Sequence, residues 1–241
     1  MSNRSDGRRR VLSRRMMLRS AVAGGLVAGS GCLSTGSSTP EYADGARIRE
    51  TAVAVGLEAR SAVVKVATGT GWMVDDGLVA TCSHVVDGDR ADIETFGGQC
   101  QEGAVLEQHD EADLALIATE IDDTGALELD TKPPSAETPV VKVGHPDAVG
   151  TWIISLGRVV RVRGERIFTD VPCGPGDSGS PLLTLEGAVI GHVTGSAVLV
   201  DDPEDLEAPE TLVQNFEGQR HVSRAYTVDS IAQFRENSAP S

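Results

Sequence analysis

The 241-residue chain joins a short basic segment at its N-terminus to a strongly acidic remainder. Residues 1–31 hold seven Arg and one Asp, so the formal charge of -15 for the whole chain becomes -21 for residues 32–241, which carry 35 acidic and 14 basic side chains. A surface this acidic argues against nucleic acid as a partner, because phosphate binding requires a basic patch.

Hydrophobic residues make up 40% of the chain, which is enough for a packed globular core. The chain has only three lysines, which are Lys65, Lys132 and Lys142. An acidic, lysine-poor surface stays hydrated in concentrated salt, which screens its self-repulsion. We therefore expect a halophilic protein, with an ordinary acidic exported protein as the alternative.

The first 31 residues have the pattern of an export signal. Arg14 and Arg15 precede a short apolar run from Ala21 to Ala28, which is too short and too rich in glycine to span a bilayer. A twin arginine before such a run is typical of a twin-arginine signal peptide. We therefore predict that residues 1–31 are a signal and that the mature protein works outside the cytoplasm; a disordered basic tail is the alternative.

Cys32 follows small residues and precedes a Ser/Thr/Gly-rich spacer over 34–40. The arrangement resembles a lipoprotein cleavage box, although Gly29 stands where leucine is usual. The spacer composition is that of a flexible linker, which we assign to residues 32–44. A lipid on Cys32 would anchor the protein to the membrane at the cell surface, and simple secretion is the alternative.

Residues 45–241 are predicted to form one all-β domain. A mixed pattern over 44–60 predicts a short amphipathic helix with Ile48, Val53, Val55 and Leu57 on its apolar side. No helix of ten or more residues alternates with the strands, which disfavours a parallel α/β sheet. Short β-rich runs between Gly and Asp turns predict two sets of strands: 62–66, 71–74, 78–81, 91–96, 104–108 and 114–119, then 140–143, 152–160, 166–170, 181–185, 188–193 and 223–227.

Three further segments complete the chain. Residues 122–138 contain Pro133 and Pro134 and are predicted to connect the two sets of strands. Residues 201–217 form an acidic insertion, which we interpret as a solvated loop in preference to a lid or a calcium loop, because it lacks the EF-hand spacing. Residues 229–236 are predicted to be a short C-terminal helix.

Three chemically active residues occur in a suggestive order. His84 ends an apolar run, Asp113 begins another, and Ser178 lies between glycines in a tight polar turn. A serine hydroxyl becomes nucleophilic when a base takes its proton, and a carboxylate can orient that base. The order His, Asp, Ser differs from the orders found in subtilisin and in the α/β-hydrolases.

These residues and their flanks resemble the chymotrypsin-like (trypsin-fold) serine proteases, and within them the HtrA/Do branch. The resemblance covers about residues 60–233. Its matching pieces are Gly69–Val74, Gly77–Thr81, Asp113–Leu116, Val143–Pro146, Phe168–Asp170, Gly176–Pro181 and Val189–Gly191. The chain ends at Ser241, so we expect no PDZ domain after the protease domain.

The resemblance implies two antiparallel six-stranded β-barrels, about 60–121 and 138–233, with a short C-terminal helix. The site would lie between them, with His84 and Asp113 from the first barrel and Ser178 from the second. Ser178 would attack a peptide carbonyl, His84 would act as base and then acid, and Asp113 would hold the imidazole. The N–H groups of Gly176 and Ser178 would form the oxyanion hole.

The resemblance also places the substrate pocket. It contains no acidic residue to pair with a basic substrate side chain, so a trypsin-like preference is disfavoured and a small or medium apolar residue is expected. His192 lies one position from the histidine of glutamate-specific relatives, so we do not predict glutamate specificity. The implied pocket residues are Pro172, Cys173, Gly174, Val193, Thr194 and Gly195.

The remaining histidines and cysteines are predicted to be structural. We therefore expect no catalytic role for His145, His192 or His221. Besides Cys32, the cysteines Cys82, Cys100 and Cys173 allow either one disulfide, between Cys82 and Cys100, or three free thiols. No His and Cys pair has metal-ligand spacing, so we expect no metal, and the chemistry requires no cofactor.

The leading hypothesis is thus an exported, lipid-anchored serine endopeptidase that acts on polypeptides in surface protein quality control or processing. A second hypothesis keeps the barrels but uses them to bind unfolded or partner chains, with slow or no catalysis. A third, an esterase on another scaffold, would leave His84 and Asp113 without a role. The oligomeric state is not readable from the sequence.

Overall fold

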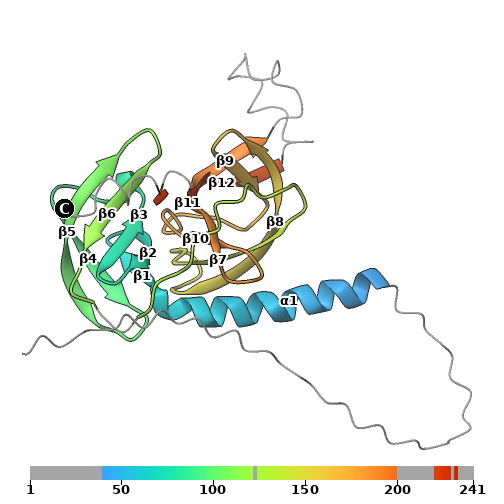
Figure 1. Cartoon of the computed structure of the whole chain (residues 1–241), viewed down its shortest axis with the longest axis horizontal. Helices are drawn as coiled ribbons and strands as arrows, with labels where there is room; N and C mark the ends of the chain where they lie inside the picture. The colour runs from blue at the N-terminus through green and yellow to red at the C-terminus, as the bar shows by residue number, and fades with distance from the viewer. Residues whose placement is uncertain (1–39, 122–123, 200–219, 229–230, 233–241) are drawn as a thin grey trace, which may run out of the picture.

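Short valine-rich strands separated by glycine and aspartate turns build the first barrel of the computed structural model, which describes residues 40–121, 124–199, 220–228 and 231–232 (Figure 1). All neighbouring strands are antiparallel, in the closed order β1-β2-β3-β6-β5-β4. The strands are β1 (Val63–Val66), β2 (Gly69–Asp75), β3 (Leu78–Thr81), β4 (Arg90–Thr95), β5 (Cys100–His109) and β6 (Leu114–Ala118).

The second barrel closes in the order β10-β11-β12-β9-β8-β7. Its strands are β7 (Pro139–Gly144), β8 (Ile153–Arg163), β9 (Arg166–Thr169), β10 (Pro181–Leu183), β11 (Val189–Leu199) and β12 (Arg220–Thr227). The predicted all-β fold with two six-stranded antiparallel barrels is confirmed. β5 and β11 are both longer than predicted. Most residues of β5 are exposed, so this strand lacks the apolar alternation that marks a strand in the sequence.

Several predicted segments lie outside the described residues. They are the signal over 1–31, residues 32–39 of the linker predicted over 32–44, the acidic insertion over 201–217 and most of the C-terminal helix over 229–236. The linker prediction is wrong for residues 40–44, which already belong to a helix. Within that last segment Ile231 is fully buried. In the part of the chain that is described, no helix is both long and apolar enough to cross a membrane.

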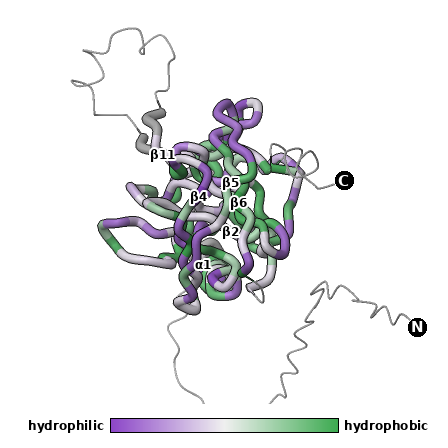
Figure 2. The backbone as a smooth tube through the Cα atoms, turned by 90° about the vertical axis from the view of Figure 1, so that its left-hand side faces the viewer, coloured by the Kyte–Doolittle hydropathy of each residue, from purple (hydrophilic) through white to green (hydrophobic). Residues whose placement is uncertain are grey.

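One hydrophobic core is shared by the two barrels. Figure 2 shows many of the hydrophobic residues in the middle of the domain and hydrophilic residues in the projecting loops. Each barrel also has an apolar interior of its own. Because the shared cluster cannot be buried by either barrel alone, its burial sets how the barrels face each other. From the first barrel it takes Val63, Trp72, Val74, Ala80, Leu114 and Leu116, and from the second Val141, Val143, Trp152, Leu183 and Val189.

Trp152 reinforces this junction with directional contacts. Its ring is 8% exposed and meets the His145 ring edge to face, with centroids 4.6 Å apart. Its indole N–H donates to the carbonyl of Val63 at 2.8 Å, and its own carbonyl accepts from Arg60 Nε at 3.0 Å. Trp152 therefore ties the start of β8 to the first barrel and to the segment that leads into β1.

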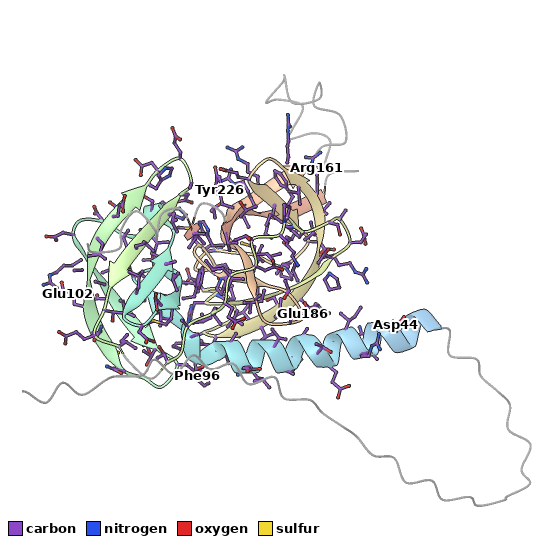
Figure 3. The ribbon with its side chains drawn as sticks, in the orientation of Figure 1. Asp44, Phe96, Glu102, Arg161, Glu186 and Tyr226 are labelled. Carbon is purple, nitrogen blue, oxygen red and sulfur yellow. The ribbon has the colours of Figure 1, made fainter. Side chains whose placement is uncertain are left out.

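A long helix, α1 (Pro40–Ala59), precedes the barrels and runs along the second one before it enters β1 (Figure 1). It packs on β7 and β8. Ala52, Gly56 and Ala59 form its buried face, whereas Val53 and Leu57 are half exposed, at 51% and 54%. The predicted helix is present, but the prediction that Val53 and Leu57 lie on its buried face is wrong. Small residues form that face because the helix approaches β8 closely. In Figure 3, Asp44 lies toward the outer end of this helix and Phe96 near its inner end.

Gly56 provides a test of this packing. A Cβ added there would come within 2.5 to 2.8 Å of three Ile154 side-chain atoms. We expect Gly56→Ala to lower the free energy of unfolding by about 1 to 2 kcal/mol, since the overlap outweighs the helix propensity that alanine adds. Urea unfolding of Gly56→Ala, Ile154→Ala and the double variant should show the double variant more stable than the sum of the singles.

Gly45→Ala is the matched control on the same helix. An added Cβ there meets only Arg49 Nη2, at 3.9 Å, so alanine should stabilise by up to about 1 kcal/mol. Equal effects of the two alanines would show that α1 does not pack on β8 as described.

Candidate active site

The turn that carries Ser178 is held in a conformation that needs glycine. Gly176 and Gly179 have φ angles of 90° and 88°. A side chain at Gly176 would overlap the carbonyl oxygen of His145, and one at Gly179 would overlap that of Thr70. Both positions therefore require glycine for backbone conformation and for close approach.

Thr70 on β2 binds this turn from the other barrel. Its backbone N–H donates to the carbonyl of Ser178 at 2.8 Å, and its hydroxyl donates to the carbonyl of Gly176, also at 2.8 Å. The Thr70 side chain is fully buried. The first barrel thus fixes the position of the serine turn through these two hydrogen bonds.

His84 and Asp113 form a close pair at the edge of the first barrel. His84 Nδ1 lies 2.8 Å and 2.9 Å from the two carboxylate oxygens of Asp113, and the His84 backbone N–H donates to the same carboxylate at 3.2 Å. Nδ1 must carry the proton to donate, which leaves Nε2 as the basic nitrogen. Half of the His84 side chain is exposed, against 20% for Asp113, so the pair opens to solvent on the histidine side.

The carbonyl of Val193 brings the histidine and serine segments together. It accepts from the N–H of Gly179 at 2.7 Å and from the thiol of Cys82 at 3.2 Å. Gly179 follows Ser178 directly, and Cys82 lies two residues before His84. These contacts bring the segment that carries His84 next to the segment that carries Ser178, although no hydrogen bond joins Ser178 to His84 among the residues that the structure describes.

The two predicted oxyanion donors are available. Within the described ranges, neither the N–H of Gly176 nor that of Ser178 makes a hydrogen bond. Their neighbours in the turn are engaged: Asp177 N–H donates to Gly174 O at 3.1 Å, and Gly179 N–H to Val193 O. Two free donors on either side of Asp177 in a fixed turn can stabilise negative charge on an oxygen.

His192 supports Asp113 from the second barrel. His192 is fully buried, and its Nε2 donates to the carbonyl of Asp113 at 3.0 Å. Burial lowers the pKa of His192 from its ordinary value, so the ring is held neutral. Asp113 has a φ of 47°, an unusual conformation for a residue with a side chain, and this hydrogen bond helps to hold it. The prediction that His192 is structural agrees with these contacts.

His145 lies beneath the serine turn. Its Nδ1 is 2.9 Å from the Thr70 hydroxyl, and its ring is 3% exposed. Burial, with a smaller effect of Lys65, lowers the pKa of His145 to about 4. The ring is therefore neutral at physiological pH and acts as a support for Thr70.

The three described cysteines are free thiols, so of the two alternatives the three free thiols are present and the disulfide between Cys82 and Cys100 is not. Cys82 is buried next to the His84–Asp113 pair, whereas Cys100 is exposed at the start of β5. Burial, and then the charge of Asp113, raises the pKa of Cys82 well above its ordinary value, so it stays a neutral thiol. Burial also raises the pKa of Cys173 to about 11.

One set of metal-type ligands exists among the described residues: Cys82, His84 and Asp113, whose donor atoms all lie within 4.8 Å of one another. The sequence analysis did not identify this cluster, because Asp113 is far from the other two residues in the sequence. The carboxylate already accepts from the imidazole and the thiol donates to a carbonyl, so the donors are engaged within the site. The expectation of no metal stays a prediction.

The predicted pocket residues lie on two segments beside the serine turn. Pro172 is exposed, Cys173 and Gly174 are half-buried, and Val193 and Thr194 on β11 are buried. Gly195 follows on β11 and pairs with Arg224 on β12. No acidic residue lies among them.

Three polar residues at the site were missed by the sequence analysis. Arg224 Nε donates to the hydroxyl of Thr194 at 3.2 Å, which places a guanidinium against the pocket strand. Thr70 holds the serine turn, and Lys142 pairs with Asp177 beneath it. Each comes from a strand far away in the sequence, so only the strand register could have identified it.

The buried histidines predict a pH-dependent stability. Folded His145 stays neutral down to about pH 4, whereas the unfolded histidine binds a proton near pH 6.5, so the unfolded chain binds more protons between these values. Stability should therefore fall as the pH drops from 7 to 4.5, with His145 contributing on the order of 3 kcal/mol over its full range. His192 acts in the same direction.

Urea unfolding at pH 7, 5.5 and 4.5 in constant salt measures this dependence. His145→Gln should be less stable at pH 7 but should lose less stability on acidification. An unchanged slope in His145→Gln would contradict the assignment of a neutral buried ring.

Known serine proteases are similar to this chain in sequence. Over 144 residues the chain is 33% identical to "Serine protease HTRA1A" of Danio rerio, and over 146 residues it is 29% identical to a "Probable periplasmic serine endoprotease DegP-like" of Hahella chejuensis. Each alignment covers 52% of this chain and 29% of the relative, so the chain spans less than a third of these proteins.

A solved structure, the Rv3671c protease of Mycobacterium tuberculosis in an inactive form, superposes with a TM-score of 0.59 at 21% identity. That alignment covers 77% of this chain and 93% of the other, and it supports the fold alone. A family model described as a trypsin-like peptidase domain matches residues 69–191, just over half of the chain. The chain therefore belongs to the trypsin-like peptidase family, with HtrA-type serine proteases among its relatives.

Proposed function

We propose that this protein is a serine endopeptidase in which Ser178, His84 and Asp113 form the catalytic triad. One observation carries the proposal: the His84 imidazole is paired through Nδ1 with Asp113, and the Val193 carbonyl accepts hydrogen bonds both from Cys82, two residues before His84, and from Gly179, directly after Ser178. Family membership and the serine protease relatives support the same reaction.

In this mechanism His84 Nε2 takes the proton of Ser178 Oγ as the oxygen attacks the substrate carbonyl. The imidazolium that forms is stabilised by the Asp113 carboxylate, and the proton then passes to the leaving amine. The N–H groups of Gly176 and Ser178 receive the developing oxyanion; loss of one such donor typically costs about 3 kcal/mol in the transition state. Water then hydrolyses the acyl-enzyme by the reverse sequence.

Substrate selection is assigned to the segments beside the turn. The pocket residues Pro172, Cys173, Gly174, Val193, Thr194 and Gly195 offer no carboxylate for a basic substrate side chain. A small or medium apolar side chain before the scissile bond therefore fits the pocket best, in a polypeptide substrate.

The proposal extends to the location of the enzyme. Arg14 and Arg15 would direct export, and a lipid on Cys32 would hold the mature protein at the membrane. The DegP-like relative is described as periplasmic, which agrees with export. A role in surface protein quality control or processing would follow from this position.

A second function is favoured by one observation, the lack of a Ser178–His84 hydrogen bond within the described residues. A catalytically weak protein that binds unfolded or partner chains would have this feature. The esterase hypothesis receives no such support, because two antiparallel barrels replace the parallel sheet that an α/β-hydrolase requires.

Covalent labelling by a fluorophosphonate probe decides between the first two functions. In multimolar KCl we expect the wild type to label, and both Ser178→Ala and His84→Ala to lose labelling, because the probe reacts with an activated serine. Lys132→Met, at an exposed lysine, is the control and should label normally. A folded wild type that does not label would favour the binding protein.

The anchor is tested separately by fractionation. Cys32→Ala should move the mature protein from the membrane fraction to the soluble exterior fraction, since a thioether-linked lipid can no longer form. Cys100→Ala controls for the loss of a thiol and should leave fractionation unchanged. A Cys32→Ala variant that stays with the membrane would remove lipidation from the proposal.

A further inference from the structure

The outer side of the second barrel carries a cluster of arginines that departs from the charge of the rest of the chain. Residues 32–241 hold 35 acidic and only 14 basic side chains, yet the strands β8, β9, β11 and β12 contain no acidic residue. Glu165 and Asp170 lie just beyond the two ends of β9, and the Asp170 carboxylate accepts from the backbone N–H of Arg158 at 2.5 Å. We call the cluster the arginine face; its residues are Arg161 and Arg163 on β8, Arg166 and Phe168 on β9, and Arg224 and Tyr226 on β12.

Strand register arranges the arginine face in two rows of three residues. Side chains two apart on a strand point to the same side of a sheet, so both rows lie on one surface. The alternate residues Ile167 and Ala225 are fully buried in the core of the second barrel, which sets the rows on its outer side. The cross-strand pairs give the rows Arg161–Phe168–Arg224 and Arg163–Arg166–Tyr226.

Two guanidinium groups of the face lie over aromatic rings. The guanidinium carbon of Arg161 is 5.3 Å from the centre of the Phe168 ring, and that of Arg166 is 5.7 Å from the centre of the Tyr226 ring. This contact attracts and orders both arginines, so binding a ligand there costs less side-chain entropy. In the part of the chain that the structure describes, none of the four arginines of the face forms an ion pair with a carboxylate. Their planar N–H groups are therefore open to carboxylates, which arginine binds through two parallel hydrogen bonds.

Both rows continue into the proposed active site. At the end of the first row, Arg224 Nε donates to the hydroxyl of Thr194, a predicted pocket residue, at 3.2 Å. At the end of the second row, the Tyr226 ring stacks on the His192 ring with centroids 6.3 Å apart, and His192 Nε2 donates to the carbonyl of Asp113. The arginine face is thus continuous with the pocket strand and with the support of the catalytic aspartate.

We propose that the arginine face is an exosite that binds an acidic segment of a polypeptide substrate. In Figure 3, Tyr226 lies toward the first barrel and Arg161 further out on the second, so the face leads away from the site. An extended polypeptide places alternate side chains about 7 Å apart, which is also the spacing of Arg161 and Arg163 along β8. The inference rests on the proposed peptidase function and adds a class of substrate to it.

Charge elsewhere on the molecule favours a polypeptide over a nucleic acid or an anionic membrane. Both of these carry negative charge over a wide area, and the acidic remainder of the chain repels whatever lies beyond the four arginines. Guanidinium groups also cover the rings of Phe168 and Tyr226, so these rings are not open for stacking with bases. An acidic segment of a polypeptide carries its charge over a short length and matches a small face.

Two peptide substrates test the exosite. They share one scissile sequence, with a small apolar residue before the bond, and their flanks are rich in Asp and Glu in one and in Asn and Gln in the other. The assay uses the lowest KCl concentration that keeps the protein folded, because salt screens exposed charges. We expect the wild type to have a KM about tenfold lower for the acidic peptide, since each exposed charge pair changes affinity by a few-fold. In Arg161→Gln/Arg166→Gln the KM for the acidic peptide should rise to that for the neutral one.

Arg47→Gln/Arg90→Gln is the matched control, because it removes two exposed positive charges from α1 and β4 and should keep the preference. Arg161→Glu/Arg166→Glu should reverse the preference in favour of a peptide with Lys-rich flanks, which damage to the fold would not do. Equal KM values of the wild type for the acidic and neutral peptides would overturn the proposal. If Arg161→Gln/Arg166→Gln lowers KM for both peptides, the face binds the acidic insertion over 201–217 of this chain and the exosite is wrong.

Binding to Ser178→Ala gives a readout that does not need activity. Fluorescence anisotropy should show a Kd for the labelled acidic peptide about tenfold below that for the neutral one, and Arg161→Gln/Arg166→Gln should remove the difference. Tighter binding of a short single-stranded DNA or of phosphatidylglycerol vesicles would overturn the proposal. If the wild type fails to label with the fluorophosphonate but the difference in Kd appears, the peptidase function is wrong and the acidic-peptide site stands. If the wild type labels and the difference is missing, the exosite is wrong.

Discussion

Two hydrogen bonds from Thr70 join the first barrel to the serine turn of the second, and the geometry of the site depends on them. They hold the carbonyls of Gly176 and Ser178, and with them the two planar peptide units that join Gly176 to Asp177 and Ser178 to Gly179. The positive φ angles at Gly176 and Gly179 are the conformational requirement of this arrangement.

The turn is held from below as well as from the side. Lys142 neutralises Asp177 within the second barrel, while His145 supports Thr70 at the barrel junction. Both interactions use buried polar groups, which are costly unless they are paired and therefore select one arrangement of the surrounding backbone. Specificity of conformation, more than stability, is the expected benefit of a buried ion pair at this position.

Apolar burial and polar pairing have separate roles in this fold. The shared hydrophobic cluster sets the relative orientation of the barrels, because neither barrel can bury it alone. The hydrogen bonds at Thr70, Val193 and His192 then fix how the segments that carry Ser178, His84 and Asp113 lie relative to one another. A small tilt of one barrel would break these contacts, so the position of Trp152 at the junction bears directly on the site.

The sequence alone determined the all-β fold, nearly all strand positions, and the order His84, Asp113 and Ser178 with their glycine setting. Local alternation and turn residues are short-range signals, so they can be detected in a single chain. Tertiary structure decided which strands close each barrel and which polar residues reach the turn. Thr70, Lys142 and Arg224 were missed because each acts on a residue from a distant strand, and register is a long-range property. The buried face of α1 and the free thiols of Cys82 and Cys100 were decided in the same way: close packing against β8 selects small residues, and the barrel places one thiol inside and the other at the surface.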